Sequence, residues 1–418
     1  MGLNTEIVIT GVGVVSPIGI GQSEMWESLV AGRSGVDTVD WLSGSEWPVR
    51  FGGELRGFEG KKYVQPRKSL KVMCREIQFG FSAASLAIEN AGLDSNSVDS
   101  DRFGVVCGTE MFYGDPHDLI AALYHCRDDQ GEYEYDKWGE HAMPHIYPLW
   151  MLMYLPNMVA CHIAIAQDAR GPNNSICLGE ASSLLALLEA VDVIDRGHAD
   201  VMVVGGAGSR LSITAMIYRG AENLSVNNDA PAQACRPFDA GRGGMVNGEG
   251  AGALVIETRA HAEARGAKPL ARVVSGGRSF GSPESRGDGM RRAITAALEA
   301  GHCRPEELSH VNCEGVGTQV DDACEAAAIR DTLGDLPVLA MKSYFGNLGA
   351  GTGMVELAGS LSSLQHGLVP RTLNYETPDP KCPVNVTREP IASDARRALV
   401  TNQSSTGQAA AVVLERLD

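Results

Sequence analysis

The sequence predicts an α/β protein whose mixed or parallel sheets are covered by helices. Short, uninterrupted apolar runs end in glycine or another small residue, which is typical of strands buried on both faces. They are Ile7–Thr10, Phe103–Val106, Val201–Val204, Ala253–Ile256 and Ala398–Thr401. Helical stretches separate several of these runs. Glycine accounts for 49 of the 418 residues without a Gly-X-Y period, which indicates many tight turns and close backbone approaches.

The clearest predicted helix spans Ser182–Arg196 and is apolar on nearly all sides. Its apolar residues are Leu184, Leu185, Leu187, Leu188, Val191, Val193 and Ile194. A helix with so little polar surface must be enclosed by the rest of the protein. We therefore expect it to lie in the core, beginning just after Gly179 and Glu180.

The segment between Tyr113 and Pro148 differs in composition from the rest of the chain. Its central part mixes acids with aromatic residues: Asp128, Asp129, Glu132, Tyr133, Glu134, Tyr135, Asp136, Trp138 and Glu140. This mixture predicts an exposed excursion that serves as a lid or an interface loop. His141 and His145, with His125 and Cys126 upstream, would suit zinc only if Pro144 did not break the helix, and a loop with spare histidines is the preferred interpretation. We expect no metal and no cofactor.

Composition and charge exclude several classes of protein. Hydrophobic residues make up 44% of the chain, and no apolar run approaches the roughly 18 residues of a membrane span. The net charge of −17 repels nucleic acid and anionic membranes. The ten cysteines form no C-x-x-C motif, and the chain begins without a secretory signal. These features predict a reduced, cytoplasmic protein of two or three domains, or of one large α/β unit, with mostly buried thiols.

Several motifs follow one another in a fixed order along the chain. They are Ile9-Thr10-Gly11-Val12-Gly13, Ser16-Pro17-Ile18-Gly19, residues 26–36, Asn157-Met158-Val159-Ala160, Gly171-Pro172-Asn173, residues 197–206, Pro237-Phe238-Asp239, residues 248–252, Lys342-Ser343 and residues 374–380. In these motifs the chain resembles the β-ketoacyl-acyl carrier protein synthases of the elongating type. The resemblance implies a thiolase-like five-layer α/β/α/β/α fold with two pseudo-repeated halves. It places one half at residues 1–256, with an insertion at about 113–148, and the other at 257–418.

The glycine motifs Gly11-Val12-Gly13 and Gly248–Gly252 do not complete the G-x-G-x-x-G pattern of a dinucleotide site. We interpret them as close-packed turns between strands.

The resemblance also locates three catalytic positions, and all three are altered in this chain. The family has a cysteine at the start of the buried helix, where this chain has Glu180. The family's two histidines correspond to Glu314, after Val311-Asn312-Cys313, and to Asn347, after residues 342–346. Cys177 lies three residues before Glu180, and we interpret it as a small core residue rather than a displaced nucleophile.

The framework around these positions matches the family at Asp322, Glu325, Lys342 and Glu356, and we count Lys342 with the site. The family's Gly-Phe-Gly-Gly gating loop is absent, because residues 402–408 read Asn-Gln-Ser-Ser-Thr-Gly-Gln. The gate phenylalanine aligns with Thr406. We therefore expect Ser405 and Thr406 to contact any substrate.

These substitutions argue against condensation, because an acylated carboxylate is a reactive anhydride and no histidine base remains. The first hypothesis is that the chain is a catalytically inactive partner of an active ketosynthase. It would then be similar to the chain length factors of type II polyketide systems, which also lack the cysteine. The second is an acyl-thioester enzyme in which Glu180 and Glu314 share a proton and carry out dehydration or hydrolysis, with Asn347 as a hydrogen-bond donor. Decarboxylation of a malonyl-carrier protein and residual condensation remain open.

The first two hypotheses predict different geometries. A catalytic pair requires the two carboxyl groups to be in direct or water-bridged contact in an apolar pocket. A scaffold requires each carboxylate to have its own partners, such as helix N-terminal amides for Glu180 and Lys342 for Glu314.

The resemblance further implies an acyl carrier protein as partner, together with a homodimer or a heterodimer with an active ketosynthase. Residues 61–75 carry basic side chains and no acid, where the family presents cations to its acidic carrier protein: Lys61, Lys62, Arg67, Lys68, Lys71 and Arg75. A solvated helix face is the alternative interpretation. Asn157–Ala160 and residues 171–175 match segments that pair across the family's two-fold axis.

Overall fold

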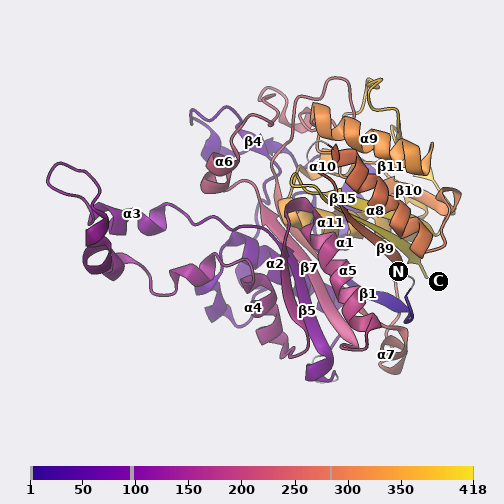
Figure 1. Cartoon of the computed structure of the whole chain (residues 1–418), viewed down its shortest axis with the longest axis horizontal. Helices are drawn as coiled ribbons and strands as arrows, with labels where there is room; N and C mark the ends of the chain where they lie inside the picture. Colours follow the sequence, from indigo (N-terminus) through magenta and orange to yellow (C-terminus); the bar gives the residue numbers. More distant parts are fainter. Residues whose placement is uncertain (1–2, 95–97, 283–284, 418) are drawn as a thin grey trace.

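The computed structural model describes residues 3–94, 98–282 and 285–417. Every predicted apolar run lies within a strand of one continuous mixed sheet (Figure 1). The longer strands are β1 (Ile7–Ser16), β5 (Phe103–Thr109), β6 (Asn173–Cys177), β7 (Val201–Ser209), β8 (Glu249–Thr258), β9 (Ala271–Phe280), β10 (Leu308–Asn312), β11 (Pro337–Leu339), β15 (Arg397–Gln403) and β16 (Gln408–Arg416). The short strands are β2 (Gly19–Ile20), β3 (Asp37–Thr38), β4 (Phe51–Gly52), β12 (Leu368–Val369), β13 (Asn385–Val386) and β14 (Ile391–Ala392).

The sheet consists of two halves with the same topology. The first half has the strand order β1-β8-β7-β5-β6 and the second has β9-β16-β15-β10-β11, extended at its edge by β13. In each half the first three strands are antiparallel neighbours and the last three are parallel neighbours. The halves meet where Ile7–Ile9 of β1 pairs with residues 271–273 of β9. This repetition confirms the two pseudo-repeated halves.

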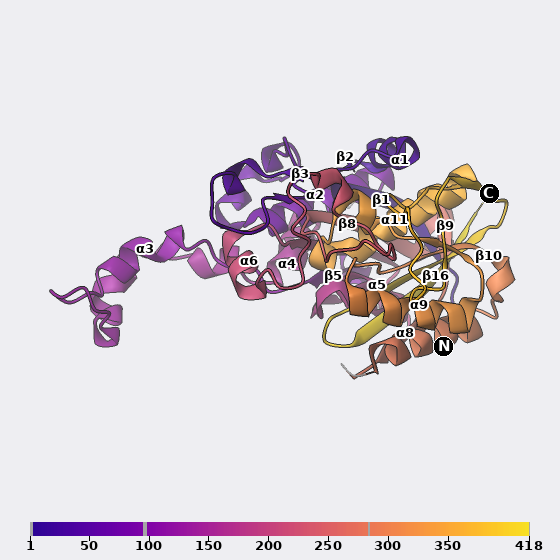
Figure 2. The same cartoon turned by 90° about the horizontal axis from the view of Figure 1, so that it is seen from above.

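Helices cover both outer faces and fill the space between the halves. The helices are α1 (Gln22–Ala31), α2 (Arg75–Asn90), α3 (His117–Tyr124), α4 (Met158–Gln167), α5 (Ser182–Asp195), α6 (Ile213–Arg219), α7 (Arg259–Ala264), α8 (Arg286–Ala300), α9 (Gln319–Leu333), α10 (Lys342–Phe345) and α11 (Thr352–His366). Helices α2 and α4 pack outside the first half, and α8, with α9 beside it, outside the second. Helices α5 and α11 contact strands of both halves (Figure 2). The predicted five-layer thiolase-like fold is confirmed.

Helix α5 is the apolar helix that the sequence predicts, and it ends one residue earlier than expected. It begins directly after a 3-10 turn at Gly179–Ala181, and its buried residues include Leu184, Leu187 and Ile194. Packing between two sheet halves explains why the helix needs no polar face.

Gly11, Gly13, Gly250 and Gly252 are strand residues at close contacts with neighbouring backbone, and Gly248 lies just before β8. The prediction of turns is therefore wrong for these four strand residues. Gly11 and Gly13 lie inside β1, where α2 crosses the sheet. A Cβ atom at Gly13 would lie only 1.9 Å from the carbonyl oxygen of Ala83. Glycine is required here because the helix backbone touches the strand.

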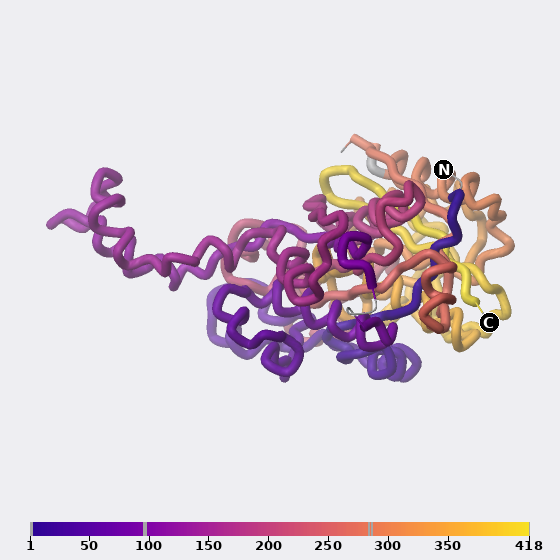
Figure 3. Tube along the Cα trace, turned by 90° about the horizontal axis from the view of Figure 1, so that it is seen from below, coloured from indigo at the N-terminus to yellow at the C-terminus, as the bar shows by residue number. Residues whose placement is uncertain are grey.

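The segment around α3 projects from the body of the molecule (Figures 1 and 3). We call this segment, residues 113–157, the arm. A small buried cluster of Ala122, Cys126 and Ala142 holds its tip together. His141 lies in a π-helical turn that ends at Ala142, and a separate 3-10 turn, Met143–His145, contains Pro144 and His145. The two histidines therefore do not share one helix face. Within the described residues, no helix is long and apolar enough to cross a membrane.

We expect the protein to be a dimer in solution. Strand β6 ends the sheet, and within the described chain its sheet neighbour is β5 alone. The backbone N–H of Ser175 donates to the side chain of Asn174 at 2.8 Å rather than to β5. An open edge of this kind is an aggregation hazard unless a second chain covers it.

Light scattering at micromolar concentration should give the mass of two chains. Ser175→Pro, which removes an N–H on the open side of β6, should shift the protein toward the monomer. A monomeric wild-type protein would contradict the prediction.

Candidate functional site

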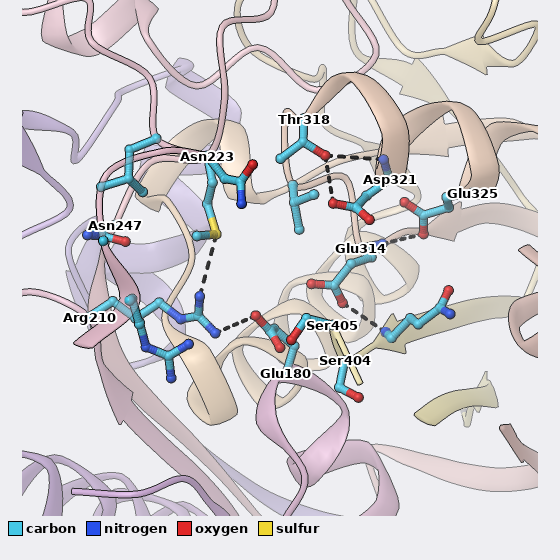
Figure 4. Close-up of a pocket in the computed structure, with 16 residues that line it drawn as sticks. Glu180, Arg210, Asn223, Asn247, Glu314, Thr318, Asp321, Glu325, Ser404 and Ser405 are labelled. Atoms are coloured by element: carbon cyan, nitrogen blue, oxygen red, sulfur yellow. Dashed lines mark hydrogen bonds and ion pairs between the residues drawn. The ribbon is translucent and has the colours of Figure 1, made fainter. Parts of the chain in front are cut away.

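A cavity of about 270 Å³ lies where the two halves of the fold meet (Figure 4). Its walls come from the turn before α5, the chain after β7, α6, the loop after β10, the start of α9 and the loop before β16. The charged side chains that line it are Glu180, Arg210, Arg219, Glu314, Asp321 and Glu325. The cavity therefore has charged walls, whereas the hypothesis of a catalytic carboxylate pair requires an apolar pocket.

Glu180 is buried at the entrance to α5, where its carboxylate binds a cation from another element. Its Oε1 accepts hydrogen bonds from Nη2 of Arg210 and, at 3.3 Å, from Nδ2 of Asn347. Met245 joins the same group, because its Sδ lies 2.9 Å from Nδ2 of Asn347 and 3.5 Å from Nη1 of Arg210. Burial, the largest single influence, raises the pKa of Glu180. Arg210, Arg219, Asn347 and the backbone N–H of Glu180 together outweigh it, so the net pKa is lowered.

Arg210 also links Glu180 to a second buried carboxylate. Its Nη2 lies 3.9 Å from Oε2 of Glu110, and the same oxygen accepts a hydrogen bond from Nη2 of Arg219. Glu180, Arg210, Glu110 and Arg219 thus alternate in charge. Sequence reasoning missed the last three, although a usable signal exists. Glu110 and Arg210 directly follow the buried parallel strands β5 and β7, so the sheet brings them to the same edge.

Glu314 has a different set of partners on the other wall of the cavity. Its Oε1 lies 3.1 Å from Nζ of Lys342, and its Oε2 accepts a hydrogen bond from the backbone N–H of Gln403 at 3.1 Å. Lys342 also binds Oε1 of Glu356 at 2.8 Å. Burial raises the pKa of Glu314; Lys342 opposes this rise and the Glu180 carboxylate adds to it. Burial likewise raises the pKa of Glu356 to about 7.

Two further buried acids hold the loop that carries Glu314. Glu325 accepts hydrogen bonds from the backbone N–H groups of Glu314 and Gly315 at 2.7 and 2.8 Å. Asp322 accepts from those of Phe238 and Gly317 at 2.8 and 2.9 Å. The framework positions therefore shape the backbone of the site. Burial, followed by the Glu314 carboxylate, raises the pKa of Glu325 to about 8.

The remaining candidate residues lie in different places. Ser405 lines the cavity, whereas Thr406 is exposed and donates a hydrogen bond to Oε1 of Gln408 at 2.6 Å. The prediction that Cys177 is a core residue is wrong, because it lies on the edge strand β6 and is exposed. Its Sγ lies 3.1 Å from Oγ1 of Thr109 and does not line the cavity.

The predicted basic patch is only partly available for docking. Lys61 and Lys62 bind Glu59 at 2.6 and 2.7 Å. Arg75 binds the buried carboxylate of Glu249 at 2.6 Å. Arg67, Lys68 and Lys71 are exposed, and so are Lys61 and Lys62 despite their ion pairs with Glu59.

The arrangement can bind polar or charged groups but lacks the chemistry of acyl transfer through a thiol. Both candidate carboxylates line one cavity, and each is paired with its own cation. Within the described residues, neither cysteine nor histidine lines the cavity. The side chains that hold Glu180 and Glu314 are thus the partners that anchor a carboxylate, not those that activate a nucleophile.

The fold is that of the thiolase-like ketosynthases, and comparisons with known proteins agree. The β-ketoacyl synthase N-terminal domain matches residues 4–262, and the C-terminal domain matches residues 261–376. The 3-oxoacyl-[acyl-carrier-protein] synthase 2 of Synechocystis sp. is 33% identical over 389 residues, which cover 90% of this chain and 89% of that protein. The chain therefore belongs to the β-ketoacyl synthase family.

Two solved structures have closely similar folds. A β-ketoacyl synthase from Burkholderia phymatum STM815 superposes with a TM-score of 0.87 at 26% identity, covering 99% of this chain and all of that one. The ishigamide ketosynthase/chain length factor gives the same TM-score, identity and coverage.

Replacing Arg210 should destabilise the protein strongly. Arg210→Met leaves Glu180 without its cation in a buried site, and breaking one side of a buried pair costs about 3–5 kcal/mol. Urea unfolding of the purified variant measures this loss. The double variant Glu180→Met/Arg210→Met should lose less, because no unpaired Glu180 charge remains.

The control is Arg56→Met, which breaks an ion pair with Asp37 at 2.9 Å between side chains that are 51% and 64% exposed. It should change stability by no more than about 1 kcal/mol. Equal losses for Arg56→Met and Arg210→Met would contradict the importance of the buried pair.

The raised pKa of Glu325 should make stability fall as pH rises. Unfolded glutamate titrates near ~4.3, whereas the folded pKa of Glu325 is about 8. Between these values the folded carboxyl group holds a proton that the unfolded one has lost, so stability decreases with pH. Urea unfolding from pH 5 to 8 should show a shallower decrease for Glu325→Gln than for the wild type. Parallel curves would rule out this contribution.

Proposed function

We propose that this chain is a non-condensing member of the β-ketoacyl synthase family that acts as a chain-length-factor-like partner of an active ketosynthase in fatty acid or polyketide biosynthesis. One observation carries the proposal. Glu180 and Glu314, at the positions that resemble the family's nucleophile and first base, are each neutralised by a separate buried cation.

The chemistry of the site supports this proposal. A condensing enzyme must form a stable thioester, whereas an acylated glutamate would be a reactive anhydride. The Glu180 carboxylate is also engaged by Arg210 and Asn347, so attack on a thioester would have to break both contacts. Losing a nucleophile and its base together costs on the order of 10⁶ in rate.

A second candidate function is general acid catalysis by Glu314 on an acyl thioester. It is favoured by the raised pKa of Glu314 and by its place in the same cavity as Glu180. However, a catalytic pair needs the two carboxyl groups to share a proton, and here the pKa of Glu180 is lowered by Arg210. The separate pairing therefore favours the partner role.

The printed names of similar proteins agree with this proposal. One structural relative at 26% identity is a ketosynthase/chain length factor, and one sequence relative acts on acyl groups attached to an acyl carrier protein. We therefore propose an acidic carrier protein as a partner, docked near Arg67, Lys68 and Lys71. The proposed dimer is a heterodimer with a ketosynthase that retains Cys-His-His, and a homodimer is the alternative.

The purified chain should not elongate an acyl-carrier protein with malonyl-carrier protein. Mass spectrometry of the carrier protein should show no β-ketoacyl product above the background without protein, and Glu180→Ala should give the same result. A product that depends on Glu180 would overturn the proposal.

The partner role is tested by sequencing the neighbouring genes and co-expressing this chain with a ketosynthase found there that retains Cys-His-His. The two proteins should co-purify, and elongation should require both. Elongation by the ketosynthase alone, at the same rate and chain length, would contradict the role. Hydrolysis or dehydration of a β-hydroxyacyl thioester that is lost in Glu314→Gln would instead support the second candidate.

A further inference from the structure

A second and larger cavity, of about 550 Å³, lies at the root of the arm and outside the site described above. It is bounded by the start of α2, the chain after β7, the start of α6, and the arm residues Tyr113, Asp115 and Tyr154. A cavity of this volume is in the range that holds a small organic ligand.

The cavity contains a buried carboxyl group that lacks a cation. Glu76, in the first turn of α2, lines the cavity and is only 7% exposed. Its contacts are a hydrogen bond with the thiol of Cys74 and one with its own backbone, and no ion pair within the described chain includes it. Burial of a carboxylate without a cation is costly, so this group is a candidate for a ligand-binding role.

The other acids around the cavity already have partners. Glu249 binds Arg75 at 2.6 Å and also accepts hydrogen bonds from Ser209 and from the backbone N–H of Leu55. Asp115 pairs with Nδ1 of His117 at 2.7 Å. The guanidinium of Arg75 is already bound to Glu249 and donates a hydrogen bond to the carbonyl oxygen of Leu55 at 2.9 Å. Glu54 lies 3.5 Å from Nε of Arg56. Glu76 is therefore the buried acid of this cavity for which the described residues show no ion pair.

The remaining walls suit the body of an organic cation. Trp41, Tyr113 and Tyr154 present aromatic rings, and Leu211 and Ile213 present aliphatic surface. Aromatic faces attract ammonium groups through the negative potential above the ring, by about 0.5–2 kcal/mol each. An inorganic divalent ion would find only one unpaired carboxyl group here, and such ions prefer several oxygen ligands.

From this geometry we propose that the cavity at the arm root binds an organic ammonium compound, with its charged group at Glu76 and its apolar body against Trp41 and Leu211. The ligand is a monoamine with an aromatic or aliphatic tail, because one carboxyl group lacks a cation. This inference does not depend on the proposed function, since none of its residues lines the first cavity.

Proton release provides a readout specific to Glu76. Burial raises its pKa to about 7, with smaller contributions from Glu249 and Glu110, and an ammonium ligand should lower it again. The titratable groups that face it are the Cys74 thiol and the charged side chains of Arg75, Glu110 and Glu249. Binding near pH 7 should therefore release a proton, and affinity should weaken by up to about tenfold for each pH unit below 7.

The experiment is isothermal titration of the purified full-length chain with phenethylamine, in buffers of different ionisation enthalpy. Phenethyl alcohol is the uncharged probe of the same shape. We expect phenethylamine to bind with proton release and the alcohol to bind at least about tenfold more weakly. Equal binding of the two, or no binding of phenethylamine at millimolar concentration, would overturn the proposal.

Variants locate the binding. Glu76→Gln keeps the shape of the side chain and removes an uncompensated buried charge, so it should fold; it should abolish proton release and weaken phenethylamine at least tenfold. Trp41→Leu, at a partly exposed position, should weaken binding several-fold while proton release remains.

Glu59→Gln, an exposed acid outside the cavity, is the matched control and should change nothing. Unaltered binding to Glu76→Gln, or displacement of phenethylamine by an equal concentration of Mg²⁺, would contradict the assignment.

Discussion

Packing of α5 and α11 between the two sheet halves is the constraint on which the site depends. Both helices are enclosed, so any charged group placed on them or at their ends is removed from water. Glu180 stands at the entrance to α5 and Glu356 lies within α11, where a lone carboxylate would be strongly destabilising. Each therefore has a buried cation, Arg210 or Lys342. The enclosed helices thus require the ion pairs that define the cavity.

Much of the fold could be predicted from the sequence because its strands are short apolar runs. Residues 201–204 and 398–401 could be assigned to strands from their own apolar side chains alone. Helix α5 is apolar on nearly all sides, so it could be stable only in the core. Position in the sheet could not be predicted in this way. Cys177 lies in a β-rich segment, and nothing in the local pattern shows that β6 is an edge strand.

The sequence located the altered catalytic positions of the site but not the residues that surround them. Motif order located Glu180, Glu314 and Asn347, but it says nothing of what neutralises them. Arg210 pairs with a residue 30 positions away, and Arg219 with one 109 positions away. The parallel strands β5 and β7 bring Glu110 and Arg210 to one edge of the sheet, where these contacts form. A charged residue directly after a buried strand is the signal in the sequence that such a contact exists, as at Glu110 and Arg210.

The two cavities are linked through α6 and Glu110. Ile213 and Thr214, at the start of this helix, line the larger cavity, while Arg219 at its end lines the smaller one. Arg219 neutralises Glu110, and the Glu110 carboxylate in turn raises the pKa of Glu76. A group that drew Arg219 away from Glu110 would leave more negative charge beside Glu76 and raise its pKa further. Because coupling between sites is reciprocal, a charged Glu76 in turn disfavours the charged form of Glu110. The charge states of the two cavities are therefore not independent.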